Sequence, residues 1–360
     1  MLTGTASRQH ALRRTLAVGL PLLLLVAIVV SAMLGQVLTG PGEVIGSVLR
    51  AVGIANDWAP SDPLVENTLW LVRFPRIAMG VGVGAALAVS GAAMQAVFGN
   101  PLAEPGVVGV SSGAALGAAA AIVALPLLSG TPGRDAAPSW LIAGCAFLGA
   151  LLTAVLVYLV SRADGRTEVT TLLLTGIAIN AFAGAGIAFL LFLANTSSRE
   201  QIVFWQLGSL NGSLWPQALL VAAVMLLGSF AAWLLGNKFD VLSLGERSAR
   251  QVGVDVERLR LASILLVALL TGVAVAFAGI IAFVGLVVPH IVRMAIGPAH
   301  RPLILASACG GAILLVVADL FARTLIRAAD LPIGMLTSLV GGPFFFYLLI
   351  RQRRGQGGWA

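Results

Sequence analysis

The chain has 360 residues, of which 59% belong to the AVILMFWYC set and 42 are glycine, whereas charged residues make up only 10%. Soluble domains average about 45–50% apolar residues with glycine included, and about 25% charged residues. So few charges cannot cover a soluble protein of this length, and the composition therefore predicts a protein of the lipid bilayer. The net charge of +7 comes without basic runs interleaved with aromatic residues, which indicates positive cytoplasmic loops rather than nucleic-acid binding.

Apolar segments of about 20 residues, the length that crosses the hydrocarbon core as a helix, recur along the whole chain. The first follows a basic stretch and is longer than the apolar region of a signal peptide, which favours a retained span. The region 258–296 fits either one long span or two short ones. We predict ten transmembrane helices, over about 16–38, 74–97, 106–128, 140–160, 170–194, 216–236, 258–277, 279–296, 303–326 and 333–350.

An even number of spans places both termini on one side of the membrane. The positive-inside rule assigns that side to the cytoplasm, because most of the 22 Lys and Arg residues then lie in cytoplasmic loops. The predicted organisation is a cytoplasmic N-terminal tail over 1–15, one transmembrane domain over 16–350 and a cytoplasmic C-terminal tail over 351–360. One cytoplasmic loop, 237–260, is long and strongly charged. Its residues 244–252 favour a short amphipathic helix, with a solvated connector as the alternative.

Two residue triplets share one spacing and predict an inverted repeat. The spacing of Gly84, Gly91 and Pro101 recurs in a later triplet, which consists of Gly272, Gly279 and Pro289. The offset between the triplets spans five helices, an odd number. The two copies would therefore cross the membrane in opposite directions, as the repeats of many transporters do.

The sequence lacks the phosphate-loop motif of nucleotide hydrolases and the HExxH motif of zinc hydrolases. Lys238 is the only lysine and stands in Gly-Asn-Lys-Phe, so the chain holds no GxxxxGK[ST] phosphate loop. HExxH does not occur, and the three histidines are far apart in sequence. Cys145 and Cys309 lie in apolar stretches, make no CxxC and are interpreted as buried small residues. We therefore predict no catalytic residue, no metal site and no cofactor in this chain.

Charged residues inside the spans are too few for ion coupling. Asp319 is the clearest, and Arg323 follows one turn later, which favours an Asp–Arg pair over a proton relay. The absence of a chain of buried acids disfavours an ion-coupled secondary transporter. A membrane structural or assembly protein is a further alternative, but it would not explain external arginines, an Asn-Pro break and a charged inner helix together.

The most specific pattern runs from Arg73-Phe74-Pro75-Arg76 through closely spaced glycines to Asn100-Pro101-Leu102-Ala103-Glu104-Pro105. Such glycines let helices approach closely in lipid. The Asn-Pro break exposes backbone groups that only protein or a water-filled path can satisfy. With 109–114 after it, this segment resembles the permease subunit of the ABC importers for ferric siderophores, haem and cobalamin. Further stretches that match the pattern of that family are 205–210, 244–253, 279–290, 330–334 and 341–343.

The resemblance covers the chain from about residue 16 to 354 and departs from the family at Asp330, where Glu is usual. It implies an all-α polytopic protein that forms a homodimer, with the pathway along the dimer axis. Two copies of a separate cytoplasmic ABC ATPase would bind ATP and Mg²⁺, and a periplasmic binding protein would deliver the substrate. The expected location is the bacterial inner membrane, and the expected mechanism is alternating access powered by the ATPase.

The resemblance also implies roles for individual residues. The coupling helix that docks on the ATPase would comprise Leu244, Gly245, Glu246, Arg247, Ser248, Ala249, Arg250, Gln251 and Gly253. Three external arginines would meet carboxylates of the binding protein, with snorkelling to lipid headgroups as the alternative, namely Arg73, Arg76 and Arg323. The cytoplasmic gate would comprise Asn100, Pro101, Leu102, Val169, Thr170 and Thr171. The pathway would be lined by Asn180, Asn195 and, in an outer lid over 201–210, Trp205.

Among the substrates of this family, an iron chelate and specifically haem is favoured. The stretches 111–117 and 208–210 resemble haem permeases most. A ferric siderophore and cobalamin are the alternatives. His290 lies in a motif that is shared across substrates, so it is interpreted as structural rather than as a haem ligand.

Overall fold

The computed structural model describes residues 3–35, 38–128, 138–163, 166–326 and 329–355. The predicted all-α class is confirmed. Within these ranges the only strands are β1 (Arg162–Ala163) and β2 (Arg166–Thr167), which form a two-residue antiparallel pair. Eight helical stretches there are long and apolar enough to cross a membrane, and two shorter apolar helices, α5 and α12, complete the ten predicted spans.

The helices follow one another with short connections. In chain order they are α1 (Thr3–Met33), α2 (Pro41–Ala51), α3 (Pro63–Asn67), α4 (Phe74–Phe98), α5 (Val110–Ala124), α6 (Pro138–Val160), α7 (Val169–Leu193), α8 (Thr196–Leu207), α9 (Trp215–Leu242), α10 (Glu246–Gln251), α11 (Val256–Ala278), α12 (Val284–Ile296), α13 (His300–Thr324) and α14 (Ile333–Gly355). Three short segments join them, a π-helical η1 (Thr68–Arg73) and the 3₁₀ turns η2 (Pro105–Val108) and η3 (Leu125–Leu128).

Some predicted helix ends are wrong for local reasons. The two-helix alternative for 258–296 is confirmed, but the second helix begins at Val284 and not at 279, because the break between the helices ends at Phe283, a non-glycine residue with φ of 67°. The span predicted from 106 begins only at Val110, because η2 and Gly109, with φ of 83°, come first. The helix α1 ends at Met33, before the predicted residue 38, and it extends back into the predicted tail 1–15, of which residues 1–2 lie outside the described part. The helix α14 continues to Gly355, and 356–360 lie outside the described part. Because a helix can continue beyond the membrane, the two cytoplasmic tails stay predictions.

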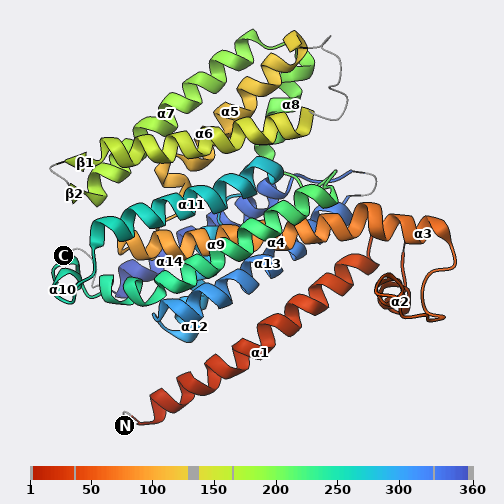
Figure 1. Cartoon of the computed structure of the whole chain (residues 1–360), viewed down its shortest axis with the longest axis horizontal. Coiled ribbons are helices and arrows are strands. Elements are labelled where there is room, and N and C mark those ends of the chain that lie inside the picture. Colours follow the sequence, from red (N-terminus) through yellow and green to blue (C-terminus); the bar gives the residue numbers. More distant parts are fainter. Residues whose placement is uncertain (1–2, 36–37, 129–137, 164–165, 327–328, 356–360) are drawn as a thin grey trace.

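The centre of the molecule is α4, in which 21 of the 25 residues are buried. Its neighbours are α9, α11, α12 and α13, whereas α5, α6 and α7 form a second layer against α11 (Figure 1). Glycines allow this close packing. A Cβ atom on Gly84 would overlap the backbone of Gly311, and one on Gly91 would overlap the carbonyl of Gly285. Small residues at such contacts let helix backbones touch in lipid.

The two ends of the bundle carry different features (Figure 1). The N-terminal end of α1, α10 and the β1–β2 pair lie at one end, which we call the α10 end. The helices α2 and α3 lie at the opposite end, which we call the α3 end. The marks for both chain termini lie at the α10 end, as an even number of spans requires.

Candidate functional site

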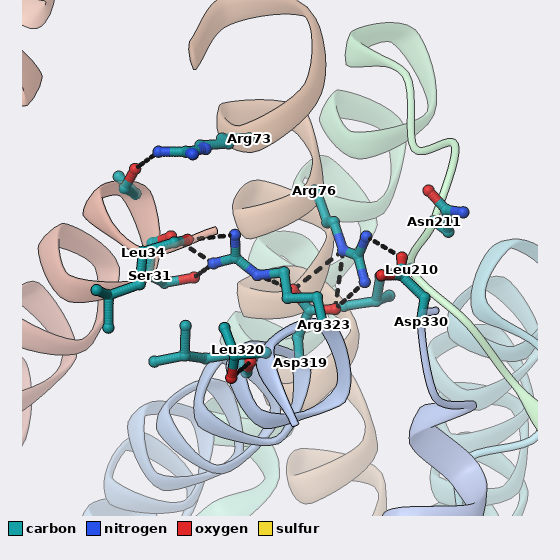
Figure 2. Close-up of polar contacts among 12 residues, drawn as sticks. Ser31, Leu34, Arg73, Arg76, Leu210, Asn211, Asp319, Leu320, Arg323 and Asp330 are labelled. Atoms are coloured by element: carbon teal, nitrogen blue, oxygen red, sulfur yellow. Dashed lines mark hydrogen bonds and ion pairs between the residues drawn. The ribbon is translucent and has the colours of Figure 1, made fainter. Parts of the chain in front are cut away.

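The three predicted docking arginines converge at the α3 end, as Figure 2 shows. Arg73 ends η1, Arg76 lies in the first turn of α4 after Pro75, and Arg323 lies in the last turn of α13. The elements that carry them therefore meet where α4 and α13 pack together. Their guanidinium groups contact the chain itself.

Arg76 forms the centre of this cluster. Its Nε donates to both carboxylate oxygens of Asp319, at 2.9 and 3.1 Å, and its Nη1 donates to Asp330 Oδ2 at 2.7 Å. The side chains of Arg76 and Asp319 are only 9% and 3% exposed, whereas that of Asp330 is 28% exposed. A planar guanidinium group suits such a two-sided contact. Arg76 therefore joins α4 to α13 and to the segment before α14.

The predicted pair between Asp319 and Arg323 is confirmed, with 3.6 Å between Asp319 Oδ2 and Arg323 Nε. Arg76 is the closer partner of Asp319, and the sequence did not predict it. Local spacing identifies pairs one helical turn apart. The pair of Arg76 and Asp319 exists only because α4 and α13 lie side by side.

The other two arginines bind the end of α1. Arg323 donates to Leu34 O at 2.7 Å and to Ser31 Oγ at 2.7 Å, and Arg73 donates to Thr39 Oγ1 at 3.0 Å and to Ala32 O. The last carbonyls of a helix lack intrahelical partners and carry partial negative charge, which attracts cations. These contacts fix the α3 end of α1. The docking role of the three arginines stays a prediction.

The predicted amphipathic helix in the loop 237–260 is confirmed as α10. Gly245 and Gly253 flank it with φ of 105° and 86°, which favours glycine at both positions. Ala249 is buried, and the rest of the helix is exposed. The large apolar side chains of Leu244 and Val252 are also exposed. A helix of this composition at the surface suits contact with another protein.

The remaining predicted coupling residues lie on this exposed surface, namely Glu246, Arg247, Ser248, Arg250 and Gln251. Glu246 and Arg250 form an i,i+4 pair at 3.6 Å, and Arg250 lies equally far from Glu257 Oε1 on α11. The helix is thus tied by charge to the start of α11. Its contact with an ATPase stays a prediction.

The two predicted gate segments lie at different places in the fold. Asn100 and Leu102 form a turn after α4, in which Asn100 Oδ1 accepts from Leu102 N at 2.9 Å, and Pro101 lies between them. Val169, Thr170 and Thr171 form the first turn of α7. A cavity of about 540 Å³ separates Val169 and Thr170 from α10. Asn100, Pro101 and Leu102 do not line that cavity.

Glu104, just after the first gate segment, is a half-buried residue with a carboxyl group that the sequence did not single out. Its Oε1 accepts from Phe283 N at 3.0 Å, at the residue with the left-handed backbone before α12. Burial raises the pKa of this carboxyl group, and the hydrogen bond from Phe283 opposes that rise. Glu104 therefore ties the Asn-Pro loop to the break between α11 and α12.

The helix α7 presents most of its surface outward. Only three of its 25 residues are buried, whereas 21 of the 25 residues of α4 are buried. Its exposed side chains include Phe182, Phe189 and Phe192. The helix α14 is also largely exposed, and a cavity of about 470 Å³ lies between it and α8, with Gln206 and Ser338 in its lining. An apolar face in a membrane protein contacts lipid or a second subunit.

The three predicted pathway residues have contacts within the chain. Asn180 on α7 accepts from Ser112 Oγ and donates to Gly106 O at 3.3 Å, so it faces α5 and η2. Asn195 caps α8 by accepting from Ser198 N at 2.8 Å, and Trp205 is half-buried against the core. Their roles in lining a pathway stay predictions.

Potential metal ligands are dispersed. Among the described residues, no three His, Cys, Asp or Glu side chains converge on one point. His300 pairs with Asp240, with 2.7 Å between Nδ1 and Oδ1, and Cys145 and Cys309 are half-buried thiols. The prediction that this chain holds no metal site rests on its sequence.

Comparisons with known proteins agree on one family. Residues 23–351 match the FecCD transport family. The hemin transport system permease protein HmuU of Yersinia pestis is 42% identical over 291 residues, which cover 81% of this chain and 85% of that protein. The cobalamin import system permease protein BtuC of Halobacterium salinarum is 42% identical over 281 residues, which cover 77% of this chain and 72% of that protein. A solved metal-chelate type ABC transporter in an inward-facing conformation has a TM-score of 0.78 and 31% identity, covering 92% of this chain and 98% of that one.

Proposed function

The chain belongs to the FecCD transport family, and on that premise we propose that it is the permease subunit of an ATP-binding-cassette importer that carries haem into the cytoplasm. The match over residues 23–351 is the observation that carries this proposal. The similarity to relatives named as permease proteins supports it. The location would be the bacterial inner membrane, with both termini in the cytoplasm.

Energy would come from a partner. The chain has one lysine and no phosphate loop, so a separate ATPase would bind ATP and Mg²⁺. The exposed helix α10, with Leu244 and Val252 beside its charges, is the surface that we assign to that ATPase. The permease itself would perform no chemistry.

The pathway would form between two copies of the chain. The exposed apolar faces of α7 and α14 would bury each other, because a subunit interface is an alternative to lipid for such surfaces. The cavity of about 470 Å³ between α8 and α14 would open toward that interface. Transport would then proceed by alternating access at the dimer axis.

Delivery of the substrate would occur at the α3 end. The cluster there holds three arginines and the two aspartates Asp319 and Asp330, which leaves one positive charge in excess. An excess of this sign steers and holds acidic groups of a binding protein. Because the arginines already bind their own chain, the acidic groups of the partner would compete for them.

The choice of haem rests on similarity to a hemin permease protein and on the motifs at 111–117 and 208–210. Cobalamin is the second candidate, because a cobalamin permease protein is similar to the same degree. A ferric siderophore is the third. The part of the chain that the structure describes gathers no metal ligands, so a chelate would enter with its iron already bound.

Uptake into proteoliposomes tests the proposal. The vesicles would hold the permease with the ATPase and binding protein encoded beside it, and haem or cobalamin would be supplied with and without ATP. We expect haem to accumulate only with ATP and binding protein. Accumulation of cobalamin instead would correct the cargo and keep the mechanism. Uptake driven by a proton gradient without the ATPase would overturn the proposed function.

A further inference from the structure

A pair of side chains from the first turns of α11 clamps the backbone just before α7. Glu257 Oε2 accepts from Thr167 N at 2.9 Å, and Arg260 Nη1 donates to Thr167 O at 2.6 Å. Both backbone polar groups of Thr167 are therefore held by residues one turn apart on a single helix. Thr167 is itself buried, and only Glu168 separates it from the first residue of α7.

Arg260 also reaches α10. Its Nη2 donates to Glu246 Oε1, and Glu246 is the first residue of that helix. The side chain of Arg260 is 3% exposed, although it carries a charge. A buried arginine is retained only where carboxylates and carbonyls satisfy it. One guanidinium group thus connects α10, α11 and Thr167, two residues before α7.

This connection forms part of the wall of the cavity of about 540 Å³ at the α10 end, which Glu257 and Arg260 also line. On one side of the cavity lie Thr167, Val169 and Thr170, and on the other lie Glu246, Arg247 and Arg250. Because the cavity separates α10 from α7, the polar contacts of Arg260 with Glu246 and Thr167 connect α10 to the start of α7. Charge-assisted hydrogen bonds of this kind are stronger than neutral ones.

We propose that Glu257 and Arg260 are positioning residues that transmit the movement of α10 to the cytoplasmic start of α7. The inference rests on the proposed function, in which an ATPase binds α10, and on the predicted gate role of the first turn of α7. When α10 is displaced, Arg260 keeps its hold on both Glu246 and Thr167. The backbone at Thr167 then moves with α10 and carries Val169 and Thr170 with it.

The test measures ATPase contact and gate movement separately. Single cysteines are placed at Thr170→Cys for the gate and at Gln251→Cys for the contact, in a chain whose two native cysteines are replaced by alanine. The permease is held in nanodiscs with its ATPase, and the rate of maleimide labelling is compared with and without ATP. The variants are Arg260→Gln, Arg260→Lys and Glu257→Gln. Arg258→Gln is the matched control, because Arg258 is 89% exposed and pairs with Asp255.

We expect Arg260→Gln to leave the ATPase-dependent protection at Gln251→Cys intact. The ATP-dependent change in labelling at Thr170→Cys should fall by about tenfold, the effect of losing one charge-assisted contact. In Arg260→Lys the ATP-dependent change in labelling should fall less, since an ammonium group can bind one of the two partners of Arg260. In Glu257→Gln the change in labelling should also fall less, because glutamine keeps an acceptor for Thr167 N. This variant provides the test if Arg260→Gln does not fold. Arg258→Gln should match the unsubstituted chain.

Two results would overturn the inference. One is an undiminished ATP-dependent change at Thr170→Cys in both Arg260→Gln and Glu257→Gln. The other is a loss of equal size in Arg258→Gln, which would show that any charge removed from this turn has the same effect. Failure of the proposed function looks different. In that case the ATPase gives no protection at Gln251→Cys even in the unsubstituted chain.

Discussion

The buried contact between Arg76 and Asp319 allows a quantitative test of what holds the α3 end together. Asp319→Leu would leave the guanidinium group of Arg76 in a buried site with only Asp330 as an acidic partner. Removing one member of a buried ion pair costs about 3–5 kcal/mol of the free energy of unfolding. Because Asp330 remains at 2.7 Å, we expect a loss near the lower limit, about 3 kcal/mol.

The double variant separates pairing from packing. Arg76→Met alone leaves Asp319 with Arg323 as its basic partner, whose Nε lies 3.6 Å away. This substitution should lower the free energy of unfolding by about 3–5 kcal/mol. Combined with Asp319→Leu, it replaces a buried ion pair by apolar groups of similar size, which is often nearly neutral. We therefore expect the double variant to be more stable than either single variant. Asp330→Asn is the control and should cost less than about 1 kcal/mol, since its carboxylate is partly exposed.

The assay is equilibrium unfolding by titration with SDS in mixed micelles, followed by tryptophan fluorescence. The four chains would be compared with the unsubstituted protein as a double-mutant cycle, which isolates the coupling between Arg76 and Asp319. A double variant whose loss equals the sum of the two single losses would refute the reasoning. It would mean that the two side chains contribute through packing and not through their charges.

Two further predictions concern the centre of the fold and the Asn-Pro loop. Gly91→Ala should prevent a stable fold in detergent, because the new Cβ would overlap the Gly285 carbonyl. Gly144→Ala on α6 is the control and should have the melting temperature of the unsubstituted chain, because, among the described residues, no atom beyond the neighbouring backbone of α6 lies within 4 Å of its new Cβ. Equal melting temperatures for both would contradict the packing of α4. Burial raises the pKa of Glu104 above its ordinary 4.5, so the folded state holds that proton more tightly than the unfolded state and stability falls as the pH rises through this range. Glu104→Gln should flatten this dependence of the melting temperature on pH, and an unchanged slope would contradict the assignment.

Features set by local sequence were predictable. The ten apolar segments and the helix α10 follow from hydropathy and from the glycines around 244–253, and both appear in the structure. The shortened α5 was not predicted, because its flanking residues Pro105–Val108 are apolar enough to resemble a helix but form a 3₁₀ turn. Hydropathy measures the length of an apolar stretch and not the backbone conformation at its ends.

The contacts that carry the proposals were not predictable. Arg76 meets Asp319 across 243 residues, and Arg260 meets Thr167 across 93. Each of these pairs depends on helices that become neighbours only in the folded chain. The sequence did identify Arg76 and Glu246 as residues of interest, through the resemblance of their motifs. Those motifs predict contacts of both residues with other proteins, whereas the structure shows contacts of both residues within the chain.

Differences in burial between the spans suggest where movement costs least. The helix α4 is buried almost throughout, so displacing it would disrupt contacts with all four of its neighbours. The helix α7 is the opposite case, since few of its residues are buried within the chain and its displacement would break few packing contacts inside its own subunit. A mobile element needs a defined attachment if a distant event is to move it in one direction. The clamp on Thr167 by Glu257 and Arg260 is such an attachment, and it lies at the end of α7 that faces α10.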